Sequence, residues 1–328
     1  MIDCPCCNEE KKKLNTSVRY VDVKFKSEEN QELFNNRKLI LCTNCNFSYS
    51  LPFLSEVNLN DFYCNSFPKR RLRSMEINAK KSFSFNLISL QRIFFASAFL
   101  KSKEKLNILD FGGGDGTNAQ QIKNLLPNAD VKICDNKIYQ NIWKFRNVNF
   151  KDLDDYDDKS IDFFFSSHTF EHINANDLNS LLYKIKKKLS NEAIIYIEVP
   201  NDNFIAFIDK EKMNEGVPVC HFSKDSLSKL VSKYFQIIDI NTRGKKRKLY
   251  EDDDNYKNFS KEKNILFRDK LKQFFEKIKI LNFVHKILNF YYQYFHKINH
   301  HKKLVSDKFF HKTKDDNGSI IALIARNS

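Results

Sequence analysis

Glycine is scarce in this chain of 328 residues, yet four of its seven glycines lie within five positions. These are Gly112, Gly113, Gly114 and Gly116. They follow the apolar run 106–111, which has the pattern of a buried strand, and precede 117–126, which has the pattern of a helix. Glycine lets the backbone turn sharply or lie against a ligand, because it has no Cβ. A strand, a glycine loop and a helix N-terminus in this order are typical of nucleotide-binding α/β proteins.

Cysteine is the second residue type with a spacing that suggests chemistry. Six of the eight cysteines lie in the first 64 residues, and two C-x2-C pairs are separated by 34 residues. The pairs are Cys4 with Cys7 and Cys42 with Cys45. Each pair can present two thiolates from one tight turn, and two such turns make a closed tetrahedral site for a structural zinc ion. Cys6 is an alternative ligand to Cys7, and reduced thiols without a metal are the alternative to zinc.

The cysteine pairs define the first of four expected parts. We expect a zinc-ribbon-like module at 1–64, with short strands at 18–25 and 38–41, because about 50 residues fold poorly without such a metal. The other parts are a helical linker at 65–104, a core at 105–242 together with 319–328, and an insert at 243–318.

The expected core alternates between strands and helices, which is the pattern of a doubly wound sheet. Residues 129–135 form a predicted strand that ends in Asp135, where an acid can hydrogen-bond the hydroxyls of a ribose. Residues 160–167 have a continuous apolar centre, typical of a strand that is buried on both faces. Further strands are expected at 147–150, 192–199, 235–241 and 319–325, with a helix at 178–189. The fold class is therefore α/β, with a Rossmann-like, mostly parallel sheet of seven strands.

These residues resemble the class I S-adenosylmethionine-dependent methyltransferases of type 11/12. The first motif of that family matches Asp110-x-Gly112-x-Gly114-x-Gly116, and the resemblance covers about 107–241 and the last strand. It implies that S-adenosyl-L-methionine is the cofactor. The residues that it assigns to the cofactor are Asp110, Gly112, Gly113, Gly114, Gly116, Asp135, Asp152, Ser167, Glu171 and His172.

The fourth core strand leads into the motif His168-Thr169-Phe170-Glu171-His172. H-x-x-E-H binds zinc in some proteases, but only on a continuous helix, whereas this motif directly follows a strand. We expect His168 and His221 to be candidate general bases. Both stand at the carboxyl end of the sheet, where ligands bind, and neutral imidazole has a suitable basicity. Two alternatives stay open: a divalent-ion cluster of His168, Glu171, His172 and His221, or a supporting role for these side chains around the cofactor.

The acceptor of the methyl group is expected from the resemblance alone. A cysteine-pair module before such a core is similar to enzymes that methylate sugars, which implies a sugar or sugar-containing metabolite of surface-glycan biosynthesis. An RNA methyltransferase is the first alternative, because the net charge is +14 and the basic surface together with the cysteine module could bind RNA. A non-catalytic scaffold is the second, although it has no need to retain Asp110 and Asp135.

The insert 243–318 carries most of the net positive charge and a helical apolar stripe. Apolar residues recur at steps of three and four from Phe267 to Ile298. Four interpretations stay open: packing on its own domain, a lid, a homodimer contact, or peripheral membrane contact through 264–300. The sequence has neither a transmembrane pattern nor the pattern of a signal peptide. We therefore expect a cytoplasmic protein, with a peripheral membrane location as the alternative.

Overall fold

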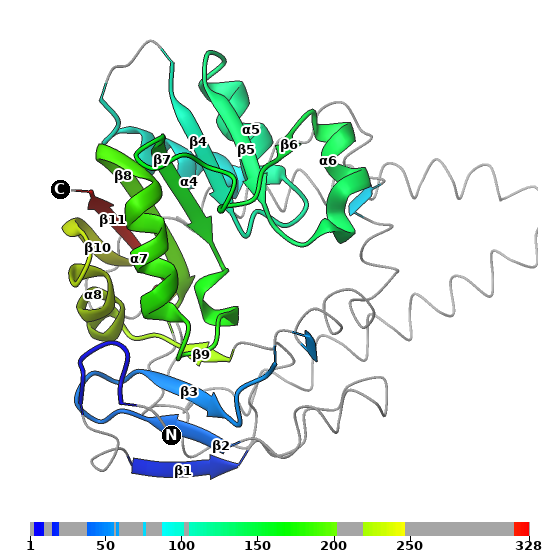
Figure 1. Cartoon of the computed structure of the whole chain (residues 1–328). Coiled ribbons are helices and arrows are strands. Elements are labelled where there is room, and N and C mark those ends of the chain that lie inside the picture. Colours follow the sequence, from blue (N-terminus) through cyan, green and yellow to red (C-terminus); the bar gives the residue numbers. More distant parts are fainter. Residues whose placement is uncertain are drawn as a thin grey trace, which may run out of the picture. The chain divides into compact units, whose positions relative to one another are not determined.

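The computed structural model describes residues 3–9, 15–19, 38–55, 57–58, 75–76, 87–101, 105–201, 219–246 and 318–327 (Figure 1). The chain divides into two compact units, 1–244 with 312–328, and 245–311. Almost all of the second unit, including the expected helix 267–298, lies outside the described residues. No helix in the described ranges is both long enough and apolar enough to cross a membrane.

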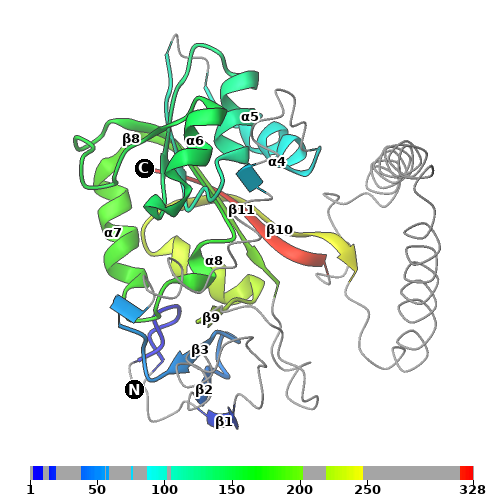
Figure 2. The same ribbon diagram turned by 90° about the vertical axis from the view of Figure 1, so that its right-hand side faces the viewer.

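A seven-stranded sheet forms the centre of the first unit, in the order β10-β11-β8-β7-β4-β5-β6. The described pairs between β4, β5, β6, β7 and β8 are parallel, and β11 runs antiparallel to β8. Figure 2 shows β11 beside β10 at one edge. The expected Rossmann-like, mostly parallel sheet is therefore confirmed. The strands are β4 (Asn107–Phe111), β5 (Asp130–Cys134), β6 (Asn149–Phe150), β7 (Ile161–Ser167), β8 (Leu189–Pro200), β10 (Gln236–Lys246) and β11 (Gly318–Arg326).

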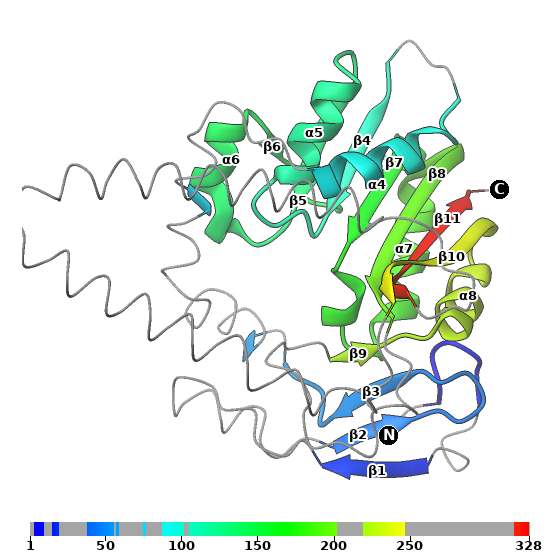
Figure 3. The same cartoon turned by 180° about the vertical axis from the view of Figure 1, so that it is seen from behind.

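Helices cover both faces of this sheet. α7 (Leu178–Lys188) lies on one face (Figure 1), and α4 (Leu87–Ser97) lies on the opposite face (Figure 3). The buried side of α7 follows the spacing of one helical stripe, with Leu178, Leu182 and Ile185 all in the core. The remaining helical elements are α5 (Thr117–Leu125), η3 (Lys137–Tyr139), α6 (Gln140–Arg146), η4 (Phe170–His172) and α8 (Lys224–Ser232).

A second sheet of four strands combines three strands from the first 51 residues with a short strand at 220–221. Its order is β1 (Asn15–Arg19), β2 (Lys38–Leu41), β3 (Ser48–Leu51) and β9 (Cys220–His221), and each described pair is antiparallel. β2 coincides with the expected strand 38–41, whereas β1 overlaps only the start of the expected strand 18–25, whose residues 20–25 are not described. β9 comes from the segment that follows the core strand β8, so the cysteine module and the core share one sheet.

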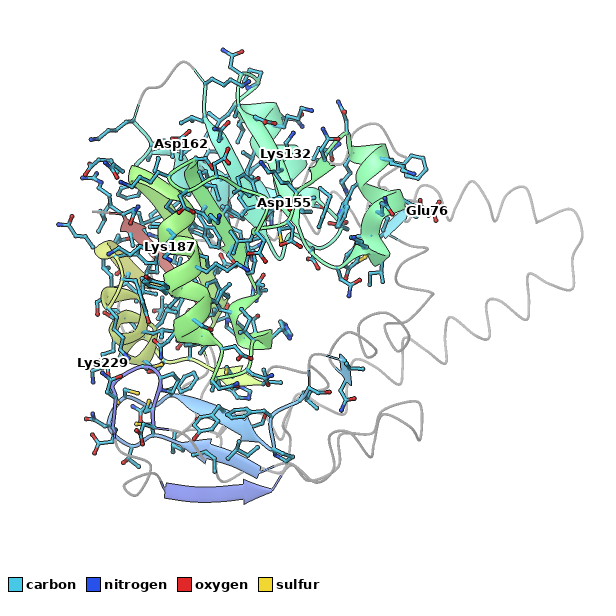
Figure 4. The ribbon with its side chains drawn as sticks, in the orientation of Figure 1. Glu76, Lys132, Asp155, Asp162, Lys187 and Lys229 are labelled. Carbon is cyan, nitrogen blue, oxygen red and sulfur yellow. The ribbon has the colours of Figure 1, made fainter. Side chains whose placement is uncertain are left out.

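Hydrogen bonds from α8 strengthen this junction. The Ser223 hydroxyl, which also caps α8, donates to the Cys45 carbonyl at 2.8 Å. Lys229, labelled in Figure 4, donates to the Asn44 carbonyl at 3.3 Å, and Lys233 donates to the Pro5 carbonyl at 2.5 Å. The backbone of both cysteine turns is therefore tied to the core.

The buried centre of β7 is expected to dominate the stability of the sheet. Phe164 is fully buried in β7, with its ring centre 5.5 Å from that of Phe111. Phe164→Ala should lower the free energy of unfolding by about 3–5 kcal/mol, because it removes a large apolar side chain and leaves a cavity. Urea denaturation followed by circular dichroism measures this loss. Phe94→Ala is the matched control, because Phe94 is 60% exposed, and it should change the free energy by less than about 0.5 kcal/mol.

Candidate functional site

The glycine loop follows β4 and leads into α5, as the sequence predicts. Gly112 has φ +70°, and a Cβ built there would lie 1.9 Å from the Thr169 hydroxyl oxygen. Gly112 is therefore required for close contact between this loop and the turn after β7. Gly114 has φ +53°, and a Cβ there would meet nothing within 4 Å. Open space beside a backbone in the left-handed region leaves room for a ligand to approach.

Two acids flank this loop, and both belong to the predicted cofactor set. Asp110, in β4, is fully buried, and neither of its carboxylate oxygens has a hydrogen-bond partner of normal geometry among the described residues. Burial, together with the nearby charge of Asp135, raises the pKa of Asp110 to about 8. Asp135, just after β5, accepts hydrogen bonds from the backbone N–H groups of Gly114 and Asn136, both at 2.5 Å. Burial raises the pKa of Asp135, although these two N–H groups oppose the increase.

Helix α6 supports the loop from outside, which sequence reasoning missed. The Trp143 indole N–H donates to the Gly114 carbonyl at 2.8 Å. The buried Arg146 guanidinium donates to Asp115 at 2.9 Å and to Gln120 at 2.7 Å. These contacts join residues about thirty positions apart in the sequence. Neither Trp143 nor Arg146 belongs to a sequence motif, so no pattern predicted which residues they contact.

Glu198 is the centre of a polar cluster at the carboxyl ends of β7 and β8. Its carboxylate is fully buried and accepts from Arg92 Nε at 2.9 Å, from the Tyr196 hydroxyl at 2.5 Å and from the Ser167 hydroxyl at 3.2 Å. Burial alone would raise the pKa of Glu198, but the Arg92 guanidinium and His168 overcome this effect and hold it at about 2. Sequence reasoning assigned no role to Arg92, Tyr196 or Glu198. Arg92 reaches the cluster from α4, more than a hundred positions away in the sequence.

The predicted residues of the turn after β7 lie close together. Glu171 is buried in η4, and its Oε1 lies 3.3 Å from His168 Nδ1 and 3.8 Å from His172 Nε2. His168 Nε2 lies 3.1 Å from Glu198 Oε1. Burial lowers the pKa of His168, but its contacts with Glu171 and Glu198 raise it to about 9. An imidazole with this pKa carries a proton at neutral pH, whereas the sequence-based argument for a general base assumed the neutral form.

The other predicted site residues lie in two different places. His221 is buried on β9, opposite Ser48 of β3, and the neighbouring Val219 N–H donates to the Glu171 carbonyl at 2.8 Å. β9 therefore adjoins η4. Asp152 is exposed, and its Oδ1 accepts from the Asp154 N–H at 3.2 Å in the turn after β6.

Asp162, a buried acid at the other end of β7, has a structural role and serves as a comparison for Asp110. Asp162, labelled in Figure 4, accepts from the Asn107 backbone N–H and from the Ser190 hydroxyl, both at 2.9 Å. Both carboxylate oxygens are thus satisfied by neighbouring strands. Asp110 lacks such partners, and we therefore treat it as a site residue.

The two cysteine pairs converge on one point. The sulfur atoms of Cys4, Cys7, Cys42 and Cys45 all lie within 4.8 Å of one another. Cys4 to Cys45 and Cys7 to Cys42 are both 3.6 Å, close to the edge of about 3.8 Å that a tetrahedron with Zn–S bonds of about 2.3 Å requires. This donor set fits zinc, with Cys7 and not Cys6 as its fourth member. Within the described ranges, these cysteines are the only group of three or more His, Cys, Asp or Glu side chains whose ligand atoms lie close enough together to hold one metal ion. The alternative ion site at His168, Glu171, His172 and His221 does not bring its ligand atoms together in this way.

Comparisons with known proteins agree with this arrangement. Residues 86–236, just under half of the chain, match a family model described as a methyltransferase domain. The match contains the glycine loop, Asp135 and the turn after β7. It shows that residues 86–236 of this chain contain a methyltransferase domain.

Solved structures of low identity have similar folds. Phosphoethanolamine N-methyltransferase 2 of Haemonchus contortus is 17% identical with a TM-score of 0.44, covering 85% of this chain and 62% of that chain. A SAM-dependent methyltransferase of Archaeoglobus fulgidus is 18% identical with a TM-score of 0.41, covering 73% and 93%. This chain thus spans less than two thirds of the length of the Haemonchus protein. The search of curated proteins found no match.

Gly112 and Gly114 are expected to differ in their response to alanine. Gly114→Ala should destabilise the fold by about 1–2 kcal/mol, the cost of a Cβ in the left-handed region. Gly112→Ala should cost more, roughly 2–5 kcal/mol, because the new Cβ also collides with Thr169. Urea denaturation of both variants measures the difference. Adding Thr169→Gly should recover part of the Gly112→Ala loss, and strictly additive effects in this cycle would contradict the proposed collision.

Proposed function

We propose that this chain is an S-adenosylmethionine-dependent methyltransferase that acts on a small molecule, and that its acceptor is a sugar or sugar-containing metabolite of surface-glycan biosynthesis. The observation that supports this most is the combination of a four-cysteine cluster with a methyltransferase core through one shared sheet. The cysteine-pair arrangement is the one that the sequence analysis found similar to enzymes that methylate sugars.

The residues around the glycine loop fit S-adenosyl-L-methionine. The buried Asp110 carboxylate, which has no hydrogen bond of normal geometry among the described residues, supports this assignment, as do the open space at Gly114 and the acid at the end of β5. We propose that Asp135 receives the ribose hydroxyls and that the loop residues hold the methionine part. Asp152, Ser167, Glu171 and His172 remain predicted cofactor contacts. When bound, the cofactor supplies a reactive methyl group on a sulfonium, so the protein mainly has to align the acceptor.

We also propose that the four cysteines hold a structural zinc ion. A closed set of four thiolates leaves no position for a substrate, so this metal would stabilise the module and take no part in the chemistry. Because Ser223 at the start of α8 donates to the Cys45 carbonyl and β9 pairs with β3, which follows that turn, the metal would also support the segment that carries His221.

The remaining sequence-based interpretations depend on residues outside the described ranges. Membrane contact and homodimer formation both relied on the basic insert, and RNA binding relied on the basic surface together with the cysteine module. Cytoplasmic location likewise stays a prediction.

Asp135→Ala is expected to weaken binding of S-adenosylhomocysteine. The loss should be about 1–3 kcal/mol, as expected when hydrogen bonds to a charged group are removed, which corresponds to roughly ten- to a hundredfold in affinity. Isothermal titration calorimetry measures it directly. Asp154→Ala, an exposed acid in the turn after β6, is the control and should bind like wild type. Equal affinities for all three proteins would contradict the assigned role of Asp135.

Cys42→Ser is expected to lose the zinc ion. Removing one thiolate should lower the metal content of purified protein well below one zinc per chain and reduce the melting temperature. Atomic emission spectroscopy and thermal denaturation measure these effects. Cys134→Ser, which alters a cysteine of β5 outside the cluster, should retain both properties. A wild-type protein without zinc after expression in zinc-supplemented medium would refute the metal site.

The acceptor can be tested with labelled S-adenosylmethionine. We expect methyl transfer to at least one member of a panel of nucleotide sugars, and none to total RNA. Transfer to RNA alone would replace the sugar proposal with the RNA alternative. Cofactor binding without transfer to either panel would exclude both acceptor classes.

A further inference from the structure

His168 occupies an unusual position between two carboxylates. Its Nδ1 lies 3.3 Å from Glu171 Oε1, and its Nε2 lies 3.1 Å from Glu198 Oε1. An ionised carboxylate only accepts hydrogen bonds, and neutral imidazole has one donor nitrogen and one acceptor nitrogen. The ring can therefore donate a hydrogen bond to both carboxylates only if both of its nitrogens carry protons.

The charges around the ring favour the doubly protonated form. Arg92 from α4 contacts both oxygens of Glu198, with Nε at 2.9 Å from Oε2 and a terminal nitrogen at 2.5 Å from Oε1, and so keeps Glu198 ionised. The His168 side chain is 41% exposed, and in its protonated form it makes two cations that face two buried carboxylates, so the charges of this cluster balance. The competing state is a neutral ring whose Nε2 accepts from Arg92. That contact is 3.4 Å long, and it would leave a lone pair facing the nearer Glu198 oxygen.

One carboxylate oxygen of Glu171 has no hydrogen-bond partner among the described residues. Its Oε1 faces His168 and His172, whereas its Oε2 is buried and has no hydrogen-bond partner among the described residues. A buried carboxylate oxygen without a donor is costly, so a bound molecule that supplies an N–H or O–H there would be favoured. The oxygen lies at the carboxyl end of the sheet, where ligands of such folds bind.

We propose that His168 is a positioning residue and not a base: it is held as an imidazolium between Glu198 and Glu171 and orients the second oxygen of Glu171 toward an N–H or O–H group of a bound ligand. This rests on the proposed function for the identity of the ligand, which is either the ammonium group of the cofactor or a hydroxyl or amine of the acceptor. The backbone supports the same role. His168 is a non-glycine residue with φ +58°, and its N–H donates to the Glu198 carbonyl at 2.9 Å, so the ring is held in an uncommon conformation.

The charge of His168 has a consequence for stability at high pH. The raised pKa, about 9, means that the cluster stabilises the fold fully below about pH 6.5, the ordinary value, and that this contribution is lost as pH rises through 9. The groups that face the ring are Glu171 from η4, Glu198 from β8 and Arg92 from α4, and Tyr196 acts through its hydrogen bond to Glu198.

Nitrogen-15 NMR of histidine-labelled full-length protein tests the protonation state, with His168→Gln used to assign the signal. We expect both ring nitrogens of His168 to be protonated at pH 7.5 and to titrate near pH 9. Glu171→Gln should lower that midpoint, because it removes one carboxylate. Glu192→Gln, the same substitution at the opposite end of β8, should leave it unchanged. A ring with an unprotonated Nε2 at pH 7.5 would overturn the proposal, whether or not the protein is a methyltransferase.

Ligand binding and turnover test the role of Glu171. If the donor is the cofactor ammonium, Glu171→Gln should weaken S-adenosylhomocysteine tenfold or more and leave 5′-methylthioadenosine, which lacks the amino acid part, unaffected. If the donor is the acceptor, S-adenosylhomocysteine affinity should be retained and kcat should fall by about 10²–10⁴-fold. Either result supports the proposal. A Glu171→Gln variant that matches Glu192→Gln in both affinity and kcat overturns it, whereas failure of wild type to bind the cofactor would refute the proposed function itself.

Discussion

A fully buried negative charge on Glu198 is the constraint around which the carboxyl end of the sheet is arranged. Burial of a carboxylate without compensation is unfavourable by several kcal/mol, so neighbouring elements must supply donors. Arg92 from α4, Ser167 and His168 from the end of β7, and Tyr196 of β8 itself all do so. One charge therefore aligns a helix, two strands and the turn that contains the predicted site residues.

The glycine loop depends on the same turn. Thr169 follows His168 directly, and its hydroxyl lies 3.3 Å from the Phe111 carbonyl and 3.4 Å from the Gly112 carbonyl. The space that Thr169 occupies is the space that a side chain at Gly112 would need. The glycine loop and the Glu198 cluster are thus in contact with two adjacent residues, Thr169 and His168.

The cysteine module is coupled to this arrangement through backbone pairing. β3 follows the second cysteine turn and pairs with β9, and Val219 beside β9 donates to the carbonyl of Glu171. A metal bound by the cysteines would therefore stabilise more than its own module, because the strand next to it also contacts the turn at the end of β7. The module and the catalytic core form one structural unit in the first compact part of the chain.

The sequence by itself determined the local features of this protein. The clustered glycines, the alternation of strands and helices and the acid at Asp135 depend on neighbours in the chain, and the same is true of each C-x2-C pair. The sheet and the glycine loop could therefore be predicted. Three contacts could be seen only in the tertiary structure: Arg92 with Glu198, Arg146 with Asp115, and β9 with β3. Each of these contacts joins positions that no local sequence pattern connects. The tertiary structure also sets the environment of His168, because contacts with Glu171 and Glu198 raise its pKa to about 9, above the ordinary value of an imidazole.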